Sequence, residues 1–555
     1  MGIGFSSNIS IDDNLCRSFF LSAMKFGDKV AYKADGGTGR SCSYRDALDI
    51  VSRFGAGLKA KCKSETEIGL LSENRPEWPI SYLSILNSGK TVVPIDANLK
   101  PAEKKNIIDS ARLKTVIVSD SQKDTISDIS SDLKLILISE DSENSWHNYF
   151  QSPTKQIEIS SDKTAALIYT SGTTGNPKAV MLTHSNLLHN LNSIGSCFQF
   201  SETDIFLSVL PLHHTLECTC GFLTPFSCGA QVVFARSLKS KEIVEDIKRS
   251  QATIMIAVPL LFEKMYDSIS RKIKTAPLVR RILFKILFSL SWLGWKFGLR
   301  LGHSLFKSMR ERAGLSSIRI FVSGGAPLPK KIAVFFNLIG FTFLEGYGLT
   351  ETSPVLTANR LDDIKFGSVG RAVPGVEVKI NKPDKNGIGE IIARGGNITP
   401  GYKDNPQATA ELIRDGWLYT GDLGKLENGY LYITGRAKNL IVSAAGKNIY
   451  PEEIEEHLFA SPYILEAVVF GRKKQNKQGE DVLAVIVPDL DQIALDFSTV
   501  SADSPDMTAL KKVMDKIVSE INSSMSGYKR INSFEIQLEE LEKTSTKKVK
   551  RFVYG

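Results

Sequence analysis

A ten-residue loop rich in glycine and hydroxyl side chains constrains the fold of this chain more than any other segment. It reads Tyr-Thr-Ser-Gly-Thr-Thr-Gly-Asn-Pro-Lys from Tyr169 to Lys178. The apolar, β-branched run Thr164 to Ile168 precedes it and predicts a strand, and a helix is expected to start at Ser185. The loop is therefore expected to connect a strand to a helix.

The composition of this loop predicts that it holds phosphate. Its glycines let backbone N–H groups approach an anion closely, its hydroxyls donate further hydrogen bonds, and Lys178 adds a positive charge. The loop is not a Walker A motif, because Pro177 separates the second glycine from the lysine. The small and hydroxyl residues concerned are Thr170, Ser171, Gly172, Thr173, Thr174 and Gly175.

Length and cysteine usage limit the class of protein. A chain of 555 residues exceeds what one hydrophobic core usually organises, so two or more domains are expected. The seven cysteines are odd in number and include no Cys-x-x-Cys pair, which argues against a disulfide framework and a zinc ribbon. The first twenty residues lack the pattern of a signal peptide. We expect a cytoplasmic protein.

Positive charge is concentrated in one segment. Residues 271–312 carry eleven Lys or Arg and one Glu, whereas the net charge of the whole chain is +8. Within this segment Ile282 to Trp295 is strongly apolar, but Lys285 interrupts it, so a membrane-spanning helix is not expected. The pattern fits a helix on an anionic membrane surface or a basic helical hairpin packed on its own domain. No nucleic-acid-binding module accompanies the charge, which disfavours that function.

Strand and helix patterns alternate through the first part of the chain. Helices are expected at Ser43 to Ala56 and Tyr82 to Gly89, and buried strands at Glu67 to Leu71, Thr91 to Pro94 and Leu113 to Val118. This alternation favours layered α/β structure with largely parallel sheet. From Gly367 to Thr434 short strands separated by Gly, Pro, Asn and Asp suggest a small antiparallel, β-barrel-like unit.

A compact α+β pattern follows Gly435. Strands are expected at 440–442, 464–470 and 481–487, and helices at 451–460 and 508–525. The predicted fold class is thus α/β, with a large N-terminal domain at 1–435 hinged to a small α+β C-terminal domain at 436–555. The basic and apolar segment would be an insertion in the large domain at about 268–316.

Three further segments favour nucleotide binding. Ser323 to Leu328 reads Ser-Gly-Gly-Ala-Pro-Leu after a predicted strand, and its glycines would let backbone lie flat against a planar ring. Glu345 to Glu351 follows another strand and offers Tyr347 for stacking, Thr350 for phosphate and a carboxylate for a hard cation. The segment Tyr419 to Asp422 is expected to place a carboxylate in a turn, where it could accept ribose hydroxyl protons.

These motifs together resemble the AMP-forming adenylating enzymes, the superfamily of acyl-CoA synthetases, luciferases and peptide-synthetase adenylation domains. The Tyr169 to Lys178 loop resembles the family's phosphate signature, and Pro211 to His214 resembles its substrate-side motif. Glu345 to Glu351 resembles the adenine and magnesium motif, and Asn439 to Glu455 the segment after the hinge. With Tyr419 to Asp422, five motifs occur in the family's order over nearly the whole chain.

The resemblance implies a role for individual residues. Thr170 and Glu351 would hold Mg²⁺, while Thr173, Thr174 and Lys178 would hold the β- and γ-phosphates of ATP. Thr350 would contact the α-phosphate, and Asp422 and Arg436 the ribose side. The resemblance also implies that adenine would bind among Gly325, Ala326, Glu345, Gly346 and Tyr347. Lys438 would be the pivot of the small domain. His214 would lie between the acyl and nucleotide sites, and Gly446 would lie beside the pantetheine arm of coenzyme A.

The catalytic lysine of the family matches Lys548. It would neutralise charge between the substrate carboxylate and the α-phosphate. The family's usual proline and glycine are replaced by Glu542 and Lys547, so Lys547 competes for the role, although Lys548 keeps the Lys-x-Lys-Arg spacing. An inactive ATP-binding scaffold is therefore a competing interpretation.

The implied reaction has two steps. A carboxylate displaces pyrophosphate from ATP to give an acyl-adenylate, and a thiol then displaces AMP. The segment from Pro259 to Ser323 resembles the insertion of long-chain acyl-CoA synthetases, so a long-chain fatty acid is the leading substrate, with ATP, Mg²⁺ and coenzyme A. Transfer to an acyl carrier protein is the nearest alternative, and only the insertion disfavours a luciferase-like monooxygenase. The small-residue stretch Leu216 to Ser227 would either line an acyl channel or form a core helix.

Overall fold

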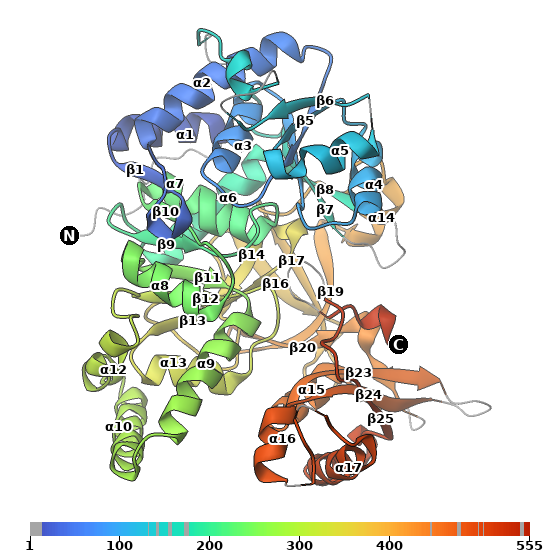
Figure 1. The fold of residues 1–555 in the computed structure, drawn as a ribbon. Helices are drawn as coiled ribbons and strands as arrows, with labels where there is room; N and C mark the ends of the chain where they lie inside the picture. Colours follow the sequence, from blue (N-terminus) through green and yellow to red (C-terminus); the bar gives the residue numbers. More distant parts are fainter. Residues whose placement is uncertain are drawn as a thin grey trace. The chain divides into compact units, whose positions relative to one another are not determined.

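The computed structural model describes residues 14–555 except 131, 140–143, 154–157, 171–176, 444–446, 474–478, 498, 503 and 544–548. Two compact units are distinguished by their internal contacts (Figure 1). Unit 1 comprises Met1–Val378, Ala393–Leu418 and Gly429–Leu431, and unit 2 comprises Lys379–Ile392, Tyr419–Asn428 and Tyr432–Gly555. The expected domain boundary at residue 435 and the pivot at Lys438 stay predictions.

The first sheet of unit 1 has the strand order β15-β14-β13-β12-β11-β9-β10-β1-β2. The strands from β1 to β13 in this order pair in parallel, and β2, β14 and β15 pair antiparallel at the two edges. Their bounds are β1 (Val30–Lys33), β2 (Ser41–Ser43), β9 (Ile205–Ser208), β10 (Gln231–Phe234), β11 (Ile254–Ala257), β12 (Ile320–Ser323), β13 (Thr342–Gly348), β14 (Val355–Ala358) and β15 (Arg371–Ala372).

The second sheet of unit 1 has the order β6-β5-β3-β4-β7-β8 and is parallel except for the β7–β8 pair. Its apolar strands are almost fully buried, as expected for parallel sheet covered on both faces. The three strands predicted between residues 67 and 118 are confirmed here. The bounds are β3 (Glu67–Leu71), β4 (Thr91–Ile95), β5 (Thr115–Val118), β6 (Lys134–Leu137), β7 (Thr164–Thr170) and β8 (Lys178–Thr183).

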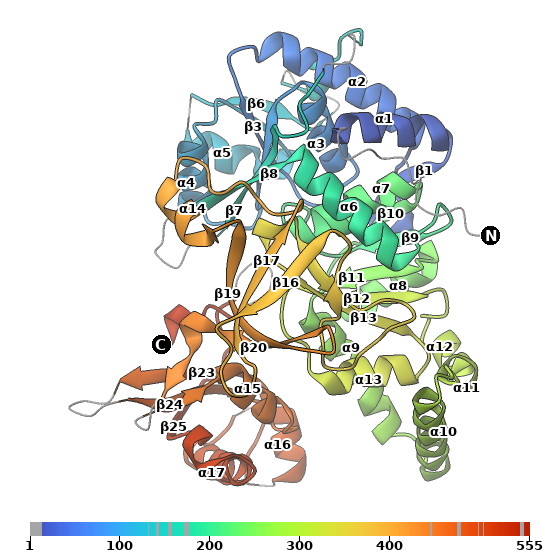
Figure 2. The same ribbon diagram turned by 180° about the vertical axis from the view of Figure 1, so that it is seen from behind.

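Helices cover both sheets of unit 1 (Figure 2). The two helices predicted near residues 43 and 82 are confirmed as α2 and α3, and both carry fully buried aromatic side chains, such as Phe54 and Trp78. The helices are α1 (Leu15–Phe26), α2 (Tyr44–Lys61), α3 (Glu77–Asn87), α4 (Pro101–Ala111), α5 (Lys123–Ile129), α6 (His184–Phe198), α7 (Thr224–Cys228), α8 (Ser240–Ser250), α9 (Pro259–Lys274), α10 (Leu278–Lys296), α11 (Gly302–Leu305), α12 (Lys307–Arg312), α13 (Lys330–Leu338) and α14 (Pro406–Leu412).

The strand expected at Thr164 to Ile168 and the helix expected from Ser185 are confirmed as β7 and α6. The expectation that the glycine-rich loop leads directly from one to the other is wrong, because a further strand intervenes. Residues 178–183 form β8, which pairs antiparallel with β7, and α6 begins only at His184. The buried side chains of Ala179, Val180 and Leu182 explain the extra strand, because they complete the apolar face of the sheet. Thr183 then caps α6, its hydroxyl accepting a hydrogen bond from the Asn186 N–H at 3.0 Å.

A third sheet has the order β16-β17-β19-β18, and β20 pairs with β19. It confirms the short strands expected after residue 367. The prediction of a turn at Tyr419 to Asp422 is wrong, because these residues lie within β19, where Gly421 adopts a φ of +69°. The bounds are β16 (Val376–Asn381), β17 (Gly389–Gly395), β18 (Ile413–Arg414), β19 (Trp417–Glu427) and β20 (Tyr430–Arg436).

Unit 2 contains the predicted α+β pattern. The strands β23-β24-β25 form one sheet, and β21 and β22 form a hairpin-like pair. Buried residues from α15, α17 and β23–β24 make a core of their own, including Ile454, Ile486 and Met514. The bounds are β21 (Ile441–Val442), β22 (Asn448–Ile449), α15 (Pro451–Phe459), β23 (Ile464–Lys473), β24 (Glu480–Pro488), α16 (Leu490–Asp496), α17 (Met507–Ser523) and β25 (Ser533–Ile536).

The basic and apolar segment forms the end of α9 and the helices α10, α11 and α12. Its longest helix, α10, packs against α9, α11 and α13 of unit 1. Both views place it at the periphery of that unit (Figures 1 and 2). Among the residues that the structure describes, α10 included, no helix is long and apolar enough to cross a membrane. The layered α/β architecture with a smaller α+β unit confirms the predicted fold class.

Candidate active site

The two described ends of the glycine-rich loop lie side by side. Thr170 ends β7 and Lys178 begins β8, and the two residues are paired in the antiparallel register. The Thr170 hydroxyl donates to the Lys178 carbonyl oxygen at 3.4 Å, and both side chains are half-buried. The intervening predicted residues Ser171, Gly172, Thr173, Thr174 and Gly175 lie outside the described residues.

Tyr402 connects this hairpin to the predicted magnesium carboxylate. The Lys178 ammonium lies 5.1 Å from the centroid of the Tyr402 ring, a cation–π distance. The Tyr402 hydroxyl donates a hydrogen bond to Glu351 Oε1 at 2.8 Å. Burial, followed by the nearby Glu351 carboxylate, raises the pKa of Tyr402 well above its usual value. A cation, a phenol and a carboxylate therefore meet at one place.

Backbone pairing along β8 fixes the position of Tyr402. The Met181 N–H donates to the Gly401 carbonyl at 3.0 Å, and the Lys403 N–H donates to the Ala179 carbonyl at 2.9 Å. The Thr399 N–H donates to the carbonyl of Glu351 itself at 2.9 Å. Tyr402 was not predicted from the sequence, because the irregular segment that carries it has no periodic pattern.

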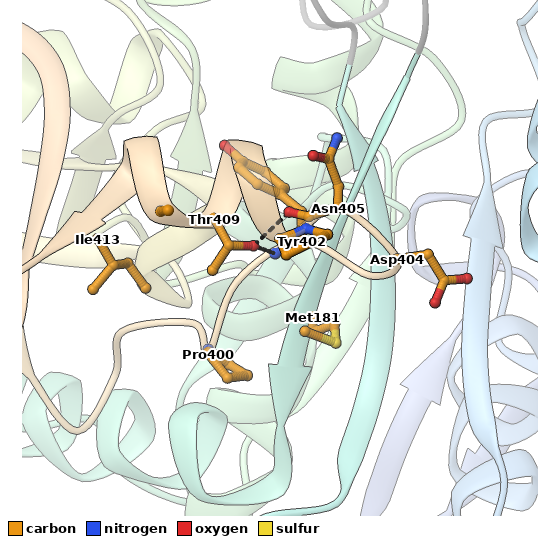
Figure 3. A pocket seen from close by; sticks show the side chains of 9 residues that line it. Met181, Pro400, Tyr402, Asp404, Asn405, Thr409 and Ile413 are labelled. Atoms are coloured by element: carbon orange, nitrogen blue, oxygen red, sulfur yellow. Dashed lines mark hydrogen bonds between the residues drawn. The ribbon is translucent and has the colours of Figure 1, made fainter.

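A pocket of about 470 Å³ lies against the same segment (Figure 3). Thr409 organises its wall: the Thr409 hydroxyl accepts from the Tyr402 N–H at 3.0 Å and donates to the Asn405 carbonyl at 2.9 Å. Of the sequence-predicted site residues that the structure describes, none lines this pocket. Its lining residues are Met181, Pro400, Tyr402, Asp404, Asn405, Pro406, Thr409, Ala410 and Ile413.

The predicted adenine residues lie at the adjacent carboxyl ends of two parallel strands. Ser323 of β12 is in register with Glu345 of β13, so the loop after Ser323 lies beside the Glu345 to Tyr347 backbone. Gly325 has a φ of +84°, which favours glycine, and Gly325 and Ala326 are exposed. The motif beginning at Glu345 was expected after a strand, but its first four residues belong to β13.

Glu345 is a buried carboxyl in this slot, with 8% of its surface exposed. Burial raises its pKa to about 8. Gly346 and Tyr347 beside it are half-buried. The Glu345 backbone is also held in place, because its carbonyl accepts a hydrogen bond from the Asn359 N–H at 2.9 Å. The slot thus combines a protonatable acid, a glycine and an aromatic ring.

His214 follows β9 in a turn closed by a hydrogen bond from its own N–H to the Pro211 carbonyl at 3.1 Å. Its ring centroid lies 4.2 Å from that of His213. His213 Nε2 lies 3.4 Å from Asp96 Oδ2, yet burial outweighs the carboxylate and lowers the pKa of His213 to about 4. The lowered pKa favours the neutral form of the His213 ring.

The stretch after His214 is a buried π-helical segment, Glu217–Leu223, which continues into α7. Glu217 accepts a hydrogen bond from the Ser208 hydroxyl at 2.5 Å, and burial raises the Glu217 pKa to about 8. The Thr219 hydroxyl donates to the Ser353 carbonyl at 3.1 Å, which ties the segment to the loop carrying Thr350 and Glu351.

The remaining described candidates lie in unit 2. Arg436 Nε is 2.9 Å from Asp422 Oδ1, and the Asp422 side chain is only 6% exposed. The Asp422 N–H donates to the Thr420 hydroxyl at 3.1 Å. Lys438 follows in a short 3-10 turn, Ala437–Asn439.

Lys548, its competitor Lys547 and Gly446 lie outside the described residues. The described residues that flank Lys548 are anchored within unit 2. Lys543 forms an ion pair with Glu466, and Lys543 and Val549 form an antiparallel bridge. Arg551 Nη2 lies 2.5 Å from Glu455 Oε2, and its Nη1 donates to the Val469 carbonyl at 2.7 Å.

Comparisons with known proteins agree with this architecture. Residues 19–403 match the family described as AMP-binding enzyme, and residues 438–553 match the AMP-binding enzyme C-terminal domain. ATP-bound MatB from Rhodopseudomonas palustris superposes with a TM-score of 0.78 over 98% of both chains at 24% identity, which shows a shared fold.

Several relatives are named as long-chain fatty acid ligases. The long-chain-fatty-acid–CoA ligase FadD15 of Mycobacterium bovis is 32% identical, covering 73% of this chain and 71% of the relative. A chloroplastic long-chain-fatty-acid–[acyl-carrier-protein] ligase of Arabidopsis thaliana, AEE15, is also 32% identical, over 60% of this chain and 52% of its own length. The predicted resemblance is confirmed, and the chain belongs to the AMP-binding enzyme family, the adenylate-forming superfamily that includes the long-chain fatty acid CoA ligases.

Proposed function

We propose that this protein activates a long-chain fatty acid with ATP to an acyl-adenylate and then transfers the acyl group to coenzyme A. The observation that carries the proposal is the meeting of Lys178, Tyr402 and Glu351. The Lys178 ammonium and the Glu351 carboxylate both contact Tyr402. Binding of Mg-ATP needs a cation for the phosphates and an oxygen ligand for the metal ion, and these two side chains supply them. The family membership and the fatty-acid ligase relatives support the same activity.

The phosphate side of the site fits Mg²⁺ and triphosphate. Glu351 supplies a carboxylate and Thr170 a hydroxyl, both oxygen ligands of the kind Mg²⁺ prefers. Mg²⁺ usually takes one or two protein carboxylates and completes its shell with substrate phosphates and water, so a single glutamate suffices. Thr173, Thr174 and Lys178 would hold the β- and γ-phosphates.

The nucleoside side fits the slot between β12 and β13. Gly325, Ala326 and Gly346 expose backbone for a flat ring, and Tyr347 offers a stacking face. Glu345, protonated in its buried position, would be a hydrogen-bond donor toward the base. Thr350 would contact the α-phosphate, and the Asp422 carboxylate, oriented by Arg436, would accept hydrogen bonds from the ribose hydroxyls.

Catalysis would rest on charge and position. The acid's carboxylate attacks the α-phosphorus, the bond to the bridging oxygen breaks, and pyrophosphate leaves. Lys548 would neutralise charge on the attacking and α-phosphate oxygens. The unit containing Lys438 would then turn, so that the thiol passes Gly446, attacks the mixed anhydride and releases AMP. His214 would lie between the acyl and nucleotide sites.

The acceptor thiol has two candidates. The relative AEE15, whose name specifies an acyl-carrier-protein ligase, favours holo-carrier protein as the second candidate. Both acceptors present the same phosphopantetheine arm.

We place the enzyme in the cytoplasm, with peripheral contact to the cytoplasmic face of a membrane.

Thioester formation tests this proposal. The full chain is assayed with ATP, Mg²⁺ and a series of saturated acids from C4 to C18, with coenzyme A or holo-carrier protein as acceptor. We expect kcat/KM to rise with chain length and to favour coenzyme A at least tenfold. A preference for carrier protein would establish the second candidate, and formation of neither thioester would refute both.

A further inference from the structure

Helix α10 has two apolar faces, of which one is buried and the other exposed. Its inner face packs on the core of unit 1 through Phe284, Leu287 and Phe288, and Ser291 and Gly294 are buried there. Its outer face is equally apolar but faces solvent. At about 3.6 residues per turn, one continuous stripe of that face is formed by Val279, Ile282, Leu283, Ile286, Leu290 and Leu293.

The exposure of this stripe is high. Val279 is 77% exposed, and the other five side chains are 45–52% exposed. Eleven of the 23 large hydrophobic side chains that are exposed in the described part of the chain lie between Leu278 and Leu301. Contiguous exposed apolar patches are uncommon on soluble proteins and mark interaction sites, so this outer face requires a partner.

Charge around the stripe indicates the chemistry of that partner. Arg281, Lys285 and Lys296 follow one edge of the stripe by helical position, and all three are exposed. The sequence contains no Asp or Glu between residues 268 and 310. A complementary surface must therefore be apolar in its interior and negatively charged where the lysines and arginine reach it.

We propose that the outer face of α10 docks on an anionic lipid bilayer. The helix would lie in the plane of the interface, with the stripe among the acyl chains and the basic edge among the headgroups. A second copy of the chain fits less well, because a two-fold interface would bring the basic edge against itself. The docking does not rest on the proposed activity, and binding alone tests it.

Vesicle co-sedimentation of the full chain provides the test. Wild-type protein should pellet with vesicles of phosphatidylcholine and phosphatidylglycerol and largely stay in solution with phosphatidylcholine alone. The double variant Ile286→Ser/Leu290→Ser should bind at least tenfold more weakly, because two inserted side chains are lost. The variant Arg281→Gln/Lys285→Gln should lose about fivefold per charge on the anionic vesicles.

A matched control removes two equally exposed hydrophobic side chains elsewhere. Leu21 is 51% and Leu465 is 55% exposed, so Leu21→Ser/Leu465→Ser should bind as the wild type does. Circular dichroism melting checks that every variant is folded. The proposal would be overturned if the wild-type protein did not bind anionic vesicles. It would also be overturned if the control variant lost binding as strongly as Ile286→Ser/Leu290→Ser.

Trp292, which is 41% exposed at the edge of the stripe, reports insertion directly. Brominated acyl chains should quench part of the tryptophan fluorescence, and Trp292→Phe should remove that part. Concentration-dependent dimerisation that Ile286→Ser/Leu290→Ser abolishes, without vesicle binding or quenching in the wild type, would assign the stripe to a second copy and refute the lipid proposal.

Discussion

Two regions of unit 1 reverse the usual distribution of side chains, in opposite ways. Around the candidate active site polar side chains are buried: Asn190 is fully buried, and Glu217 and Glu345 are nearly so. On the outer face of α10 large hydrophobic side chains are exposed. Most polar side chains are exposed and most large apolar patches are buried, so each of these two regions needs a specific explanation.

The difference is whether the partner lies within the chain. Asn190 of α6 satisfies both backbone groups of Val355, donating to its carbonyl at 2.8 Å and accepting from its N–H at 3.2 Å. That contact holds β14, which follows the Glu351 loop. The stripe on α10 has no such partner within the part of unit 1 that the structure describes. The first region thus fixes its own geometry, and the second requires another surface.

Removing a buried polar partner should lower the stability more than any truncation on the stripe of α10. Asn190→Ala would leave the Val355 N–H without its side-chain partner and open a small cavity, whereas the Val355 carbonyl keeps the hydrogen bond from Asn397 Nδ2 at 3.0 Å. The free energy of unfolding should therefore fall by about 1–3 kcal/mol. Urea denaturation measures this. Ser196→Ala, at an exposed position of the same helix, is the control and should change stability by less than about 0.5 kcal/mol. Equal effects would mean that Asn190 does not hold β14.

Glu345 should make stability depend on pH. Its folded pKa of about 8 lies above the ordinary value of 4.5, so between these pH values the folded protein binds the extra proton. Stability should therefore fall as pH rises from about 5 to 8, by at most about 1.4 kcal/mol per pH unit. Glu345→Gln, which stays neutral, should make this part of the profile less steep in melting experiments, and the remaining slope would come from other buried carboxyls such as Glu217. A profile unchanged by the substitution would contradict the assignment.

Tyr402→Phe should weaken the active site without unfolding it. The substitution removes one hydrogen bond to Glu351 and keeps the ring below Lys178. A hydrogen bond to a charged group contributes about 1.5–3 kcal/mol, so acid-dependent ATP–pyrophosphate exchange should fall about tenfold or more. Titration with Mg²⁺ should show a higher requirement for the metal. If Tyr402→Phe exchanges pyrophosphate as the wild type does, Tyr402 does not position Glu351.

The smallest effect is expected on α10. Leu283→Ala truncates a side chain that is 52% exposed, so the free energy of unfolding should change by less than about 0.5 kcal/mol. Leu188→Ala on α6, where the side chain is fully buried, should cost about 2–5 kcal/mol. A large loss for Leu283→Ala would show that the stripe already has an internal partner, and the comparison of the two regions would fail.

Local patterns predicted much of the fold. The strand at Glu67–Leu71 and the helix beginning near Pro451 were predicted because their apolar spacing and capping signals lie within the elements themselves. β8 was missed because a hairpin depends on pairing across the loop, which no local pattern reports. The turn expected at Asp422 failed for a similar reason, since β19 continues through the positive φ of Gly421.

Candidate site residues were predictable where a motif contained them. Glu345, Tyr347 and Glu351 stand within seven residues, so one motif indicated all three. Tyr402 is 51 residues from Glu351, and only the pairing of its segment with β8 brings the two together. The outer stripe of α10 was visible as apolar sequence, but its exposure depends on which face the rest of unit 1 covers.

Fatty-acid-dependent ATP–pyrophosphate exchange tests the central claim most directly, because it isolates formation of the acyl-adenylate. Wild-type protein should exchange pyrophosphate only with a long-chain acid and Mg²⁺ present. Lys548→Ala should lower exchange at least about a hundredfold while ATP binding persists, and Lys547→Ala should retain most of it. Absence of acid-dependent exchange in the wild type, or full exchange in Lys548→Ala, would contradict the account.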